Sequence, residues 1–246
     1  MKILQDKYYK KFEADNYFSR WLENNESSRK MTEKKLRSEK KEILKILKKN
    51  INLKNKKILE IGCFIGDLLY CLKSKYNCTV KGVEPSKKAV LLAKNKFKIK
   101  IENKIFIESK FFPVSKENSN QFDIIICDDV LSWFDRDNLI KIICSIDNLL
   151  KKNGYIFFKD FSPSKNFAFK NHHYSKKNIY NFKQANGHKM FFLSTGKYKL
   201  IYNKNFFSKK YQKITVKDKE AIKWNYALVK KINFFTHPIK NFDDKI

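Results

Sequence analysis

The feature that most constrains this chain is a series of short apolar stretches that begins at Lys57 and alternates with segments of helical length. The stretches are KILEI, CTVKGVE, KIFIE, FDIIIC and YIFFKDF, each five to seven residues long. Short apolar runs separated by helices are typical of parallel strands covered on both faces of a sheet. Helix-initiating residues follow two of them, at Pro85 and Ser86 and again at Asp135 or Asp137. The pattern therefore predicts an α/β fold with a doubly wound sheet.

The 246 residues are enough for one such domain with a small cap, but not for two independent catalytic domains. Residues 1–50 are highly charged, carry aromatic residues from Tyr8 to Trp21, and predict an N-terminal helical lid or cap. Residues 51–246 form the predicted Rossmann-like domain, mostly parallel with an antiparallel C-terminal strand. The segment 162–192 is expected to be a substrate-facing insertion, and further strands are expected at MFFLS and YKLIYN.

The net charge of +29 raises the question of a nucleic-acid partner, but only four of the 54 basic residues are arginines. Proteins that read phosphates or base edges favour the bidentate arginine fork over the lysine point charge. A solvated, lysine-rich surface is the simpler reading, so a nucleic-acid partner is not expected.

The cellular compartment is predicted from three features. No stretch approaches the roughly 18 consecutive apolar residues of a membrane span, and the N-terminus lacks the pattern of a secretion signal. Five scattered cysteines without a CxxC pair argue against both a disulfide framework and a zinc site. We therefore expect a cytoplasmic protein with reduced thiols.

A cofactor constellation follows the first predicted strand. Ile58 to Asp67 reads as a strand, a tight turn with Gly62 and Gly66, and the start of a helix. Glu84 stands 24 positions after Glu60, at the end of the second strand, where a carboxylate can take both hydroxyls of a ribose. The glycine turn flanked by two acids predicts a nucleoside pocket.

The stretches EIGCFIG, GVEPS and FDIIICDDVLSWF resemble the first, second and fourth motifs of class I S-adenosylmethionine-dependent methyltransferases over about residues 55–160. The resemblance implies S-adenosylmethionine as cofactor, with glycines beside its methionine moiety, an acid on its ribose and polar residues near its adenine. The implied cofactor-binding residues are Glu60, Gly62, Phe64, Gly66, Glu84, Pro85, Glu108, Ser109, Asp128 and Asp129. Phe64 departs from the family pattern, which usually has a glycine at that position.

A dehydrogenase is the nearest competitor, since it also uses a strand, a glycine turn and a downstream acid. Its fingerprint needs G-x-G-x-x-G to seat a pyrophosphate, and the spacing of Gly62 and Gly66 does not supply it. Asp67 at the turn would also oppose a pyrophosphate.

Methyl transfer needs alignment of acceptor and cofactor, and a base is optional. For a hydroxyl acceptor the candidates are Asp129, Asp160, His172 and His173. The sharpest hypothesis is that His172 or His173 is the general base, oriented by Asp160 at the end of the fifth strand; solvent exposure of both histidines is the equally weighted alternative. His188 and His237 are expected to be structural.

The C-terminal elements HHY, YNFKQ and FLSTG are similar to a pattern in uncharacterised bacterial methyltransferases encoded among cell-surface polysaccharide genes. This resemblance implies a sugar or glycan-precursor acceptor, with Tyr180 and Lys183 beside the two histidines on the acceptor side. Trp133, in the fourth motif, is a further substrate candidate. The family's acid after the KQ pair is replaced here by Ala185.

Three hypotheses remain open. The first is an O-methyltransferase acting on a small molecule or saccharide. The second is an RNA or protein methyltransferase that docks through the lysine-rich surface, although the site after the fourth strand reads CDDV and lacks the N-P-P-Y of base-methylating enzymes. The third is a non-catalytic cofactor-binding module. No metal is expected, because adjacent acids at a strand end are more often a helix cap plus a ligand contact.

Overall fold

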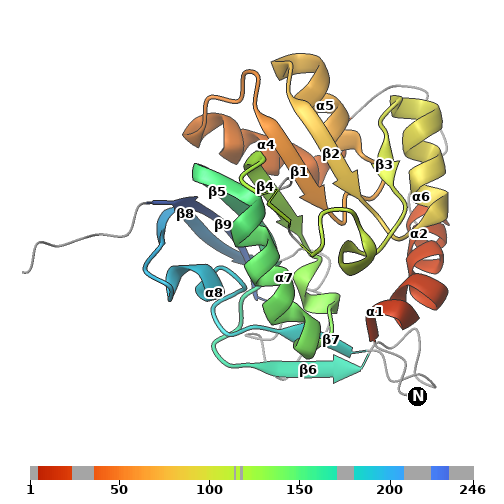
Figure 1. Ribbon diagram of the computed structural model, residues 1–246. Coiled ribbons are helices and arrows are strands. Elements are labelled where there is room, and N and C mark those ends of the chain that lie inside the picture. Colours follow the sequence, from red (N-terminus) through yellow and green to blue (C-terminus); the bar gives the residue numbers. More distant parts are fainter. Residues whose placement is uncertain are drawn as a thin grey trace, which may run out of the picture.

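The computed structural model describes residues 5–23, 36–113, 115–116, 119–170, 180–207 and 223–232. Its centre is a seven-stranded sheet in the order β3-β2-β1-β4-β5-β9-β8 (Figure 1). The strands are β1 (Lys57–Ile61), β2 (Thr79–Val83), β3 (Ile101–Glu102), β4 (Phe122–Asp128), β5 (Leu150–Phe161), β8 (Tyr198–Phe207) and β9 (Lys223–Lys231). The first five strands pair in parallel, whereas β9 is antiparallel to both of its neighbours, β5 and β8. The predicted mostly parallel Rossmann-like sheet with an antiparallel C-terminal strand is confirmed.

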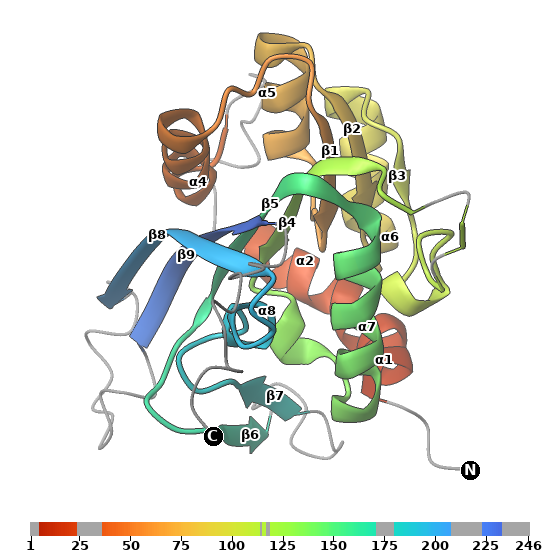
Figure 2. The same cartoon turned by 60° about the vertical axis from the view of Figure 1, so that its left-hand side comes forward.

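Helices cover both faces of the sheet (Figure 2). On one face, α4 (Ser38–Asn50) and α5 (Asp67–Tyr76) share a buried apolar cluster with Ile124 and Ile126 of β4. On the other, α7 (Arg136–Leu149) shares a cluster with Ile125 and Cys127 of the same strand. Successive side chains of a strand point to opposite faces, so the continuous apolar run of β4 supplies both layers.

Both predicted helix starts are confirmed by capping hydrogen bonds. The hydroxyl oxygen of Ser86 accepts from the amide of Ala89 at the start of α6 (Lys87–Leu92), which continues as η2 (Ala93–Phe97). The carboxylate of Asp135 accepts from the amide of Asp137 at the start of α7. Such caps satisfy amide groups that the first turn of a helix leaves unpaired.

Two of the predicted strands are wrong. The stretch KIFIE contains the 3-10 turn η3 (Phe106–Glu108), and the third strand is instead the short β3. The stretch MFFLS forms α8 (Met190–Leu193), from which Phe192 is buried against the rings of Phe158 and Tyr198. In both stretches one buried aromatic side chain anchors a short helical turn. An apolar run this short has no hydrophobic periodicity from which a helical turn could be distinguished from a strand.

The N-terminal segment consists of α1 (Gln5–Tyr8), the π-helical turn η1 (Tyr9–Glu13) and α2 (Ala14–Glu23). The carboxylate of Asp6 accepts hydrogen bonds from the amide of Asp135 and the side chain of Asn138, at the start of α7. The carboxylate of Asp15 accepts from Ser86 at the start of α6. The segment therefore bridges the loops after β2 and β4, at the carboxyl edge of the sheet. Its role as a lid stays a prediction, whereas α4, also in the predicted cap, packs in the core.

A second, two-stranded sheet lies within the predicted insertion. It pairs β6 (Phe167–Lys170) with β7 (Tyr180–Lys183) in antiparallel fashion. The backbone amide of Tyr180 donates to the side chain of Gln5, which in turn donates to the carbonyl of Trp133. Gln5 thereby ties β7 to the loop after β4. None of the helices in the described part of the chain is both long and apolar enough to cross a membrane.

Candidate functional site

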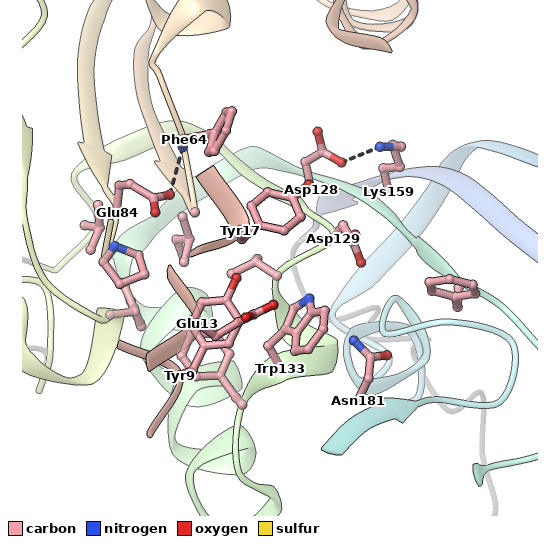
Figure 3. Close-up of a pocket in the computed structure, with 18 of the residues that line it drawn as sticks. Tyr9, Glu13, Tyr17, Phe64, Glu84, Asp128, Asp129, Trp133, Lys159 and Asn181 are labelled. Atoms are coloured by element: carbon pink, nitrogen blue, oxygen red, sulfur yellow. Dashed lines mark hydrogen bonds and ion pairs between the residues drawn. The ribbon is translucent and has the colours of Figure 1, made fainter. Parts of the chain in front are cut away.

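A cavity of about 790 Å³ opens at the carboxyl edge of the parallel strands, where open α/β sheets bind their ligands. Its walls come from the N-terminal segment, the loops after β1, β2 and β4, and strands β5, β7 and β9. Figure 3 shows Glu84 on one side of the cavity and Asp129, Trp133 and Asn181 on the other. The cavity thus has two halves, one at the glycine turn and one beside β7.

The glycine turn after β1 forms the floor of the first half. Gly62 has φ +70°, and a Cβ at this position would lie 2.9 Å from a methyl carbon of Val130. The amides of Gly62 and Cys63 donate to the carbonyl of Val83, which fixes the turn against the end of β2. A residue with a side chain would be both strained and crowded here, so the turn requires glycine.

Phe64, which stands where the related family usually has glycine, adopts φ +51° and lines the cavity. Its ring packs against those of Tyr17, Phe18 and Trp21 from α2. The departure from the family pattern therefore joins the glycine turn to the N-terminal segment through an aromatic cluster.

Glu84 is held rigidly at the end of β2. One carboxylate oxygen accepts from the amide of Phe64 and the other from the amide of Ser86, both at 2.9 Å. Burial raises the pKa of Glu84 to about 7, and the two amide hydrogen bonds oppose that rise. Glu84 and the adjacent Pro85 both line the cavity, so the carboxylate is fixed in position with oxygen lone pairs left for a ligand.

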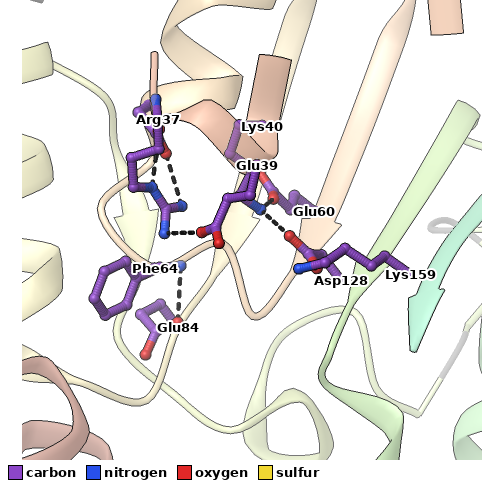
Figure 4. Close-up of polar contacts among 9 residues, drawn as sticks. Arg37, Glu39, Lys40, Glu60, Phe64, Glu84, Asp128 and Lys159 are labelled. Atoms are coloured by element: carbon purple, nitrogen blue, oxygen red, sulfur yellow. Dashed lines mark hydrogen bonds and ion pairs between the residues drawn. The ribbon is translucent and has the colours of Figure 1, made fainter. Parts of the chain in front are cut away.

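A buried ion-pair network lies behind the glycine turn (Figure 4). The ammonium of Lys40, on α4, lies 2.7 Å from carboxylate oxygens of both Glu60 and Asp128. Lys159 lies 3.0 Å from the other oxygen of Asp128. Burial opposes ionisation of Asp128, but the two lysines outweigh it and hold its pKa well below its usual range. The network fixes α4 to the carboxyl ends of β1, β4 and β5.

Glu60 is wholly buried in this network and is absent from the residues that line the cavity. Its partner Lys40 lines the cavity instead, together with Arg37 and Asp128. Arg37 forms a two-pronged contact with Asp67, at 2.9 and 3.0 Å, and its guanidinium stacks 4.9 Å from the Phe64 ring centroid. Arg37 therefore balances the negative charge of Asp67, at the glycine turn.

Arg37 and Lys40 were not predicted as site residues. Their signal is a spacing of three: Arg37 immediately precedes α4 and Lys40 lies in its first turn, in line with the buried Ile43 and Leu47. Both cations therefore lie on the side of the helix that faces the sheet.

The two residues expected near adenine lie beside the cavity rather than in its wall. The carboxylate of Glu108 pairs with Lys10 at 2.7 Å, and the hydroxyl of Ser109 donates to the carbonyl of Phe106. The wall at this point is formed by Lys104, Ile105 and Phe106. Gly66, also expected at the cofactor, is likewise outside the described lining and shapes the start of α5.

The second half of the cavity is aromatic and polar. Trp133, a predicted substrate residue, lines it and packs against Tyr9 with ring centroids 5.3 Å apart. Lys183, also predicted, points its ammonium at the ring of Phe161, 3.0 Å from the centroid. Residues that sequence reasoning missed here include Asn181 and Trp224, both buried and both in the wall. Tyr180 lies outside the described lining.

Both carboxylate oxygens of Asp160 have partners. One carboxylate oxygen accepts from the hydroxyl of Ser132 and from the amide of Phe161, and the other lies 2.9 Å from Nδ1 of His188. The cavity wall does not include Asp160. His188, expected to be structural, is thus the imidazole beside Asp160 in the described part of the chain. His172 and His173 lie outside the described residues, so their predicted contact with Asp160 stays a prediction.

Comparisons with known proteins agree with this arrangement. Residues 29–236 match a family described as methyltransferase domain. The ubiquinone biosynthesis O-methyltransferase of Coxiella burnetii is 31% identical over 116 residues, which is 47% of this chain and 47% of that relative. The chain therefore spans about half the length of the curated relatives that it matches.

Solved structures resemble the chain over most of its length at low sequence identity. The magnesium protoporphyrin IX methyltransferase of Synechocystis has a TM-score of 0.61 at 14% identity and covers 94% of this chain and 98% of its own. The 1,6-didemethyltoxoflavin-N1-methyltransferase of Burkholderia thailandensis has a TM-score of 0.60 at 12% identity and covers 95% and 93%. The chain belongs to the family of methyltransferase domains and has the fold of class I S-adenosylmethionine-dependent methyltransferases.

Proposed function

We propose that the protein transfers the methyl group of S-adenosylmethionine to a hydroxyl of a small molecule, such as a sugar or glycan precursor. The observation that carries this proposal is a cavity that joins a fixed carboxylate suited to a ribose to an aromatic and polar half. The family match and the named activities of the relatives support the reaction class. A reducing, cytoplasmic compartment suits the free cysteines.

The residues of the first half fit the cofactor. Glu84 would accept the ribose hydroxyls, because its oxygens are held by amides and face the cavity. Gly62, whose φ of +70° favours glycine, would form the tight turn beside which the methionine portion approaches the backbone. Arg37, just before α4, and Lys40, in its first turn, would face the cofactor carboxylate. Bound there, the cofactor supplies an electrophilic methyl on a sulfonium, and the protein supplies alignment and exclusion of water.

The second half suits a compact, hydroxylated acceptor. Aromatic rings of Tyr9, Trp133 and Phe161 provide apolar faces, and Asn181 and Lys183 provide polar groups between them. Sugars present the same mixture of apolar C–H faces and hydroxyls. The cavity volume of about 790 Å³ favours a small ligand over a folded macromolecule. His172, His173 and Tyr180 complete this proposal as acceptor-side residues. Asp160, at the end of β5, would orient a histidine or the acceptor.

Transfer of tritium from S-adenosyl-[methyl-³H]methionine tests the reaction. The acceptor panel consists of UDP-glucose, UDP-glucuronate, catechol, total RNA and casein, each with purified full-length protein. The proposal expects label in a hydroxyl acceptor and none in RNA or casein. Label in RNA or casein would favour macromolecular methylation through the lysine-rich surface, whereas cofactor binding without transfer to any acceptor would indicate a non-catalytic module.

A further inference from the structure

Four buried polar atoms gather in the second half of the cavity without a hydrogen-bond partner among the described residues. They are Oδ1 of Asp129, Oδ1 of Asn181, Nζ of Lys183 and Nε1 of Trp224, and all four residues line the cavity. Asn181, Lys183 and Trp224 are only 1%, 2% and 6% exposed. Leaving such atoms unpaired is costly, so a ligand that pairs with them is expected. They comprise two donors and two acceptors, which matches hydroxyl groups.

The backbone at the end of β4 separates Asp129 from its neighbour. Asp128 points into the ion-pair network, where lysines contact both of its oxygens. Asp129 adopts φ +51°, and its amide donates to the carbonyl of Lys159. This strained turn directs the Asp129 side chain toward Trp133 and Asn181 (Figure 3). A carboxylate with an unpaired oxygen is therefore presented to the acceptor half.

Lys183 is a buried cation of this half. It comes from β7, its ammonium lies 3.0 Å from the centroid of Phe161 and 5.2 Å from that of Phe169, and no described carboxylate lies within ion-pair distance of it. Its charge is balanced at longer range by Asp129 and Asp160. Of these two, Asp160 is held by Ser132, Phe161 and His188, so Asp129 has the carboxylate oxygen left free to react.

We propose, on the basis of the proposed methyl transfer, that Asp129 receives the acceptor's proton and that Lys183 keeps Asp129 ionised for this step. The acceptor oxygen forms its bond to the methyl carbon while the carbon–sulfur bond breaks, and the electron pair of that bond stays on sulfur. The hydroxyl proton moves to the carboxylate of Asp129, which then releases it to solvent. The acceptor is accordingly an alcohol or phenol that needs deprotonation.

The charges around Asp129 support the role. Burial raises the pKa of Asp129 to about 7, Lys183 lowers it and Asp160 raises it. Lys159 lowers the pKa of Asp129 and Asp128 raises it, and Tyr9 and Tyr17 of the N-terminal segment interact electrostatically with Asp129. Burial lowers the pKa of Lys183 to about 8 against the pull of Asp129. A base with a pKa near neutrality combines ionisation with proton affinity at working pH.

The rate should therefore fall as pH drops below about 7, because protonated Asp129 cannot take a proton. Asp129→Asn should lower kcat about a hundredfold or more and remove this acid limb. Lys183→Met removes the cation that favours ionised Asp129, so the limb should move to higher pH, whereas Lys183→Arg should leave it in place. Asp123→Asn, at the opposite end of β4, is the matched control and should keep the limb.

Two measurements decide the proposal. With the protein saturated with S-adenosylhomocysteine, ¹³C NMR of labelled aspartate should show one carboxyl, absent from Asp129→Asn, that titrates near pH 7 and moves upward in Lys183→Met. Kinetics then use the panel acceptor with the highest turnover. A carboxyl that titrates near the ordinary aspartate value of about 3.9 would overturn the proposal. So would loss of the limb in His172→Gln or His173→Gln but not in Asp129→Asn. Absence of all methyl transfer would refute the proposed reaction. The titration would still show whether Asp129 is ionised near pH 7.

Discussion

Replacing Lys40 with methionine will lower the free energy of unfolding by about 3–5 kcal/mol. The ammonium lies 2.7 Å from both Glu60 and Asp128, whose side chains are 0% and 6% exposed. Methionine fills much of the same space but leaves two buried carboxylates short of a cation. Asp128 keeps Lys159, whereas Glu60 loses the hydrogen-bond partner of its Oε1, and its Oε2 has none among the described residues.

The loss of unfolding free energy in Lys40→Met should grow as pH rises. Burial already raises the pKa of Glu60 to about 7 while Lys40 opposes the rise, so the variant should hold Glu60 protonated to still higher pH. An acid whose folded-state pKa lies above its unfolded value costs stability as pH rises between the two values. Urea unfolding should therefore show a larger difference between variant and wild type at about pH 8 than at about pH 5.

Lys41→Met is the matched control for this prediction. Lys41 is the next residue on α4 and is exposed, so its replacement should change the free energy of unfolding by no more than about 0.5 kcal/mol. Equal effects of the two substitutions would mean that the network contributes nothing specific and that α4 is held by its apolar face alone.

Replacing Glu84 with alanine will weaken the binding of S-adenosylhomocysteine by roughly ten- to a hundredfold, which corresponds to about 1.5–3 kcal/mol. The variant loses the acceptor proposed for the ribose hydroxyls. It also leaves the amides of Phe64 and Ser86 without their partner, which loosens the turn that borders the cavity. Isothermal titration calorimetry measures both affinity and stoichiometry.

Two further variants separate these causes. Glu84→Gln keeps the shape and one carbonyl oxygen, so it should bind more tightly than the alanine variant but less tightly than wild type. Asp137→Ala removes an exposed acid from α7 and should bind as wild type does. If Glu84→Ala retained full affinity, the ribose assignment would fail.

The fold and the first half of the site were largely predictable from the sequence because their signals are local. The buried strands β1, β4 and β5 contain the short apolar runs KILEI, FDIIIC and YIFFKDF. Helix α5 and strand β2 lie between Gly62 and Glu84, which fixes their separation. Parallel pairing of β1 and β2 then brings their carboxyl ends together. Local sequence plus one topological rule is enough to place Glu84 beside the glycine turn.

The rest of the site depends on packing between distant segments, which no local pattern encodes. Lys40 reaches Glu60 and Asp128 only because α4 docks on the strand ends, and the sequence alone indicated a charged cap there. Trp224 comes from β9, whose place next to β5 is set by antiparallel pairing across more than sixty residues. The sequence predicts that Asp160 orients a catalytic histidine, but its pairing with the buried His188 depends on three-dimensional packing.

Calorimetric titration of the wild-type protein with S-adenosylhomocysteine, and separately with NAD⁺, tests the central claim most directly. Both ligands carry an adenosine whose ribose could meet Glu84, but NAD⁺ also carries a pyrophosphate, for which this turn lacks the G-x-G-x-x-G cradle. The cavity described here predicts binding of one S-adenosylhomocysteine per chain and no detectable heat from NAD⁺. Binding of NAD⁺, or a failure to bind S-adenosylhomocysteine, would contradict it.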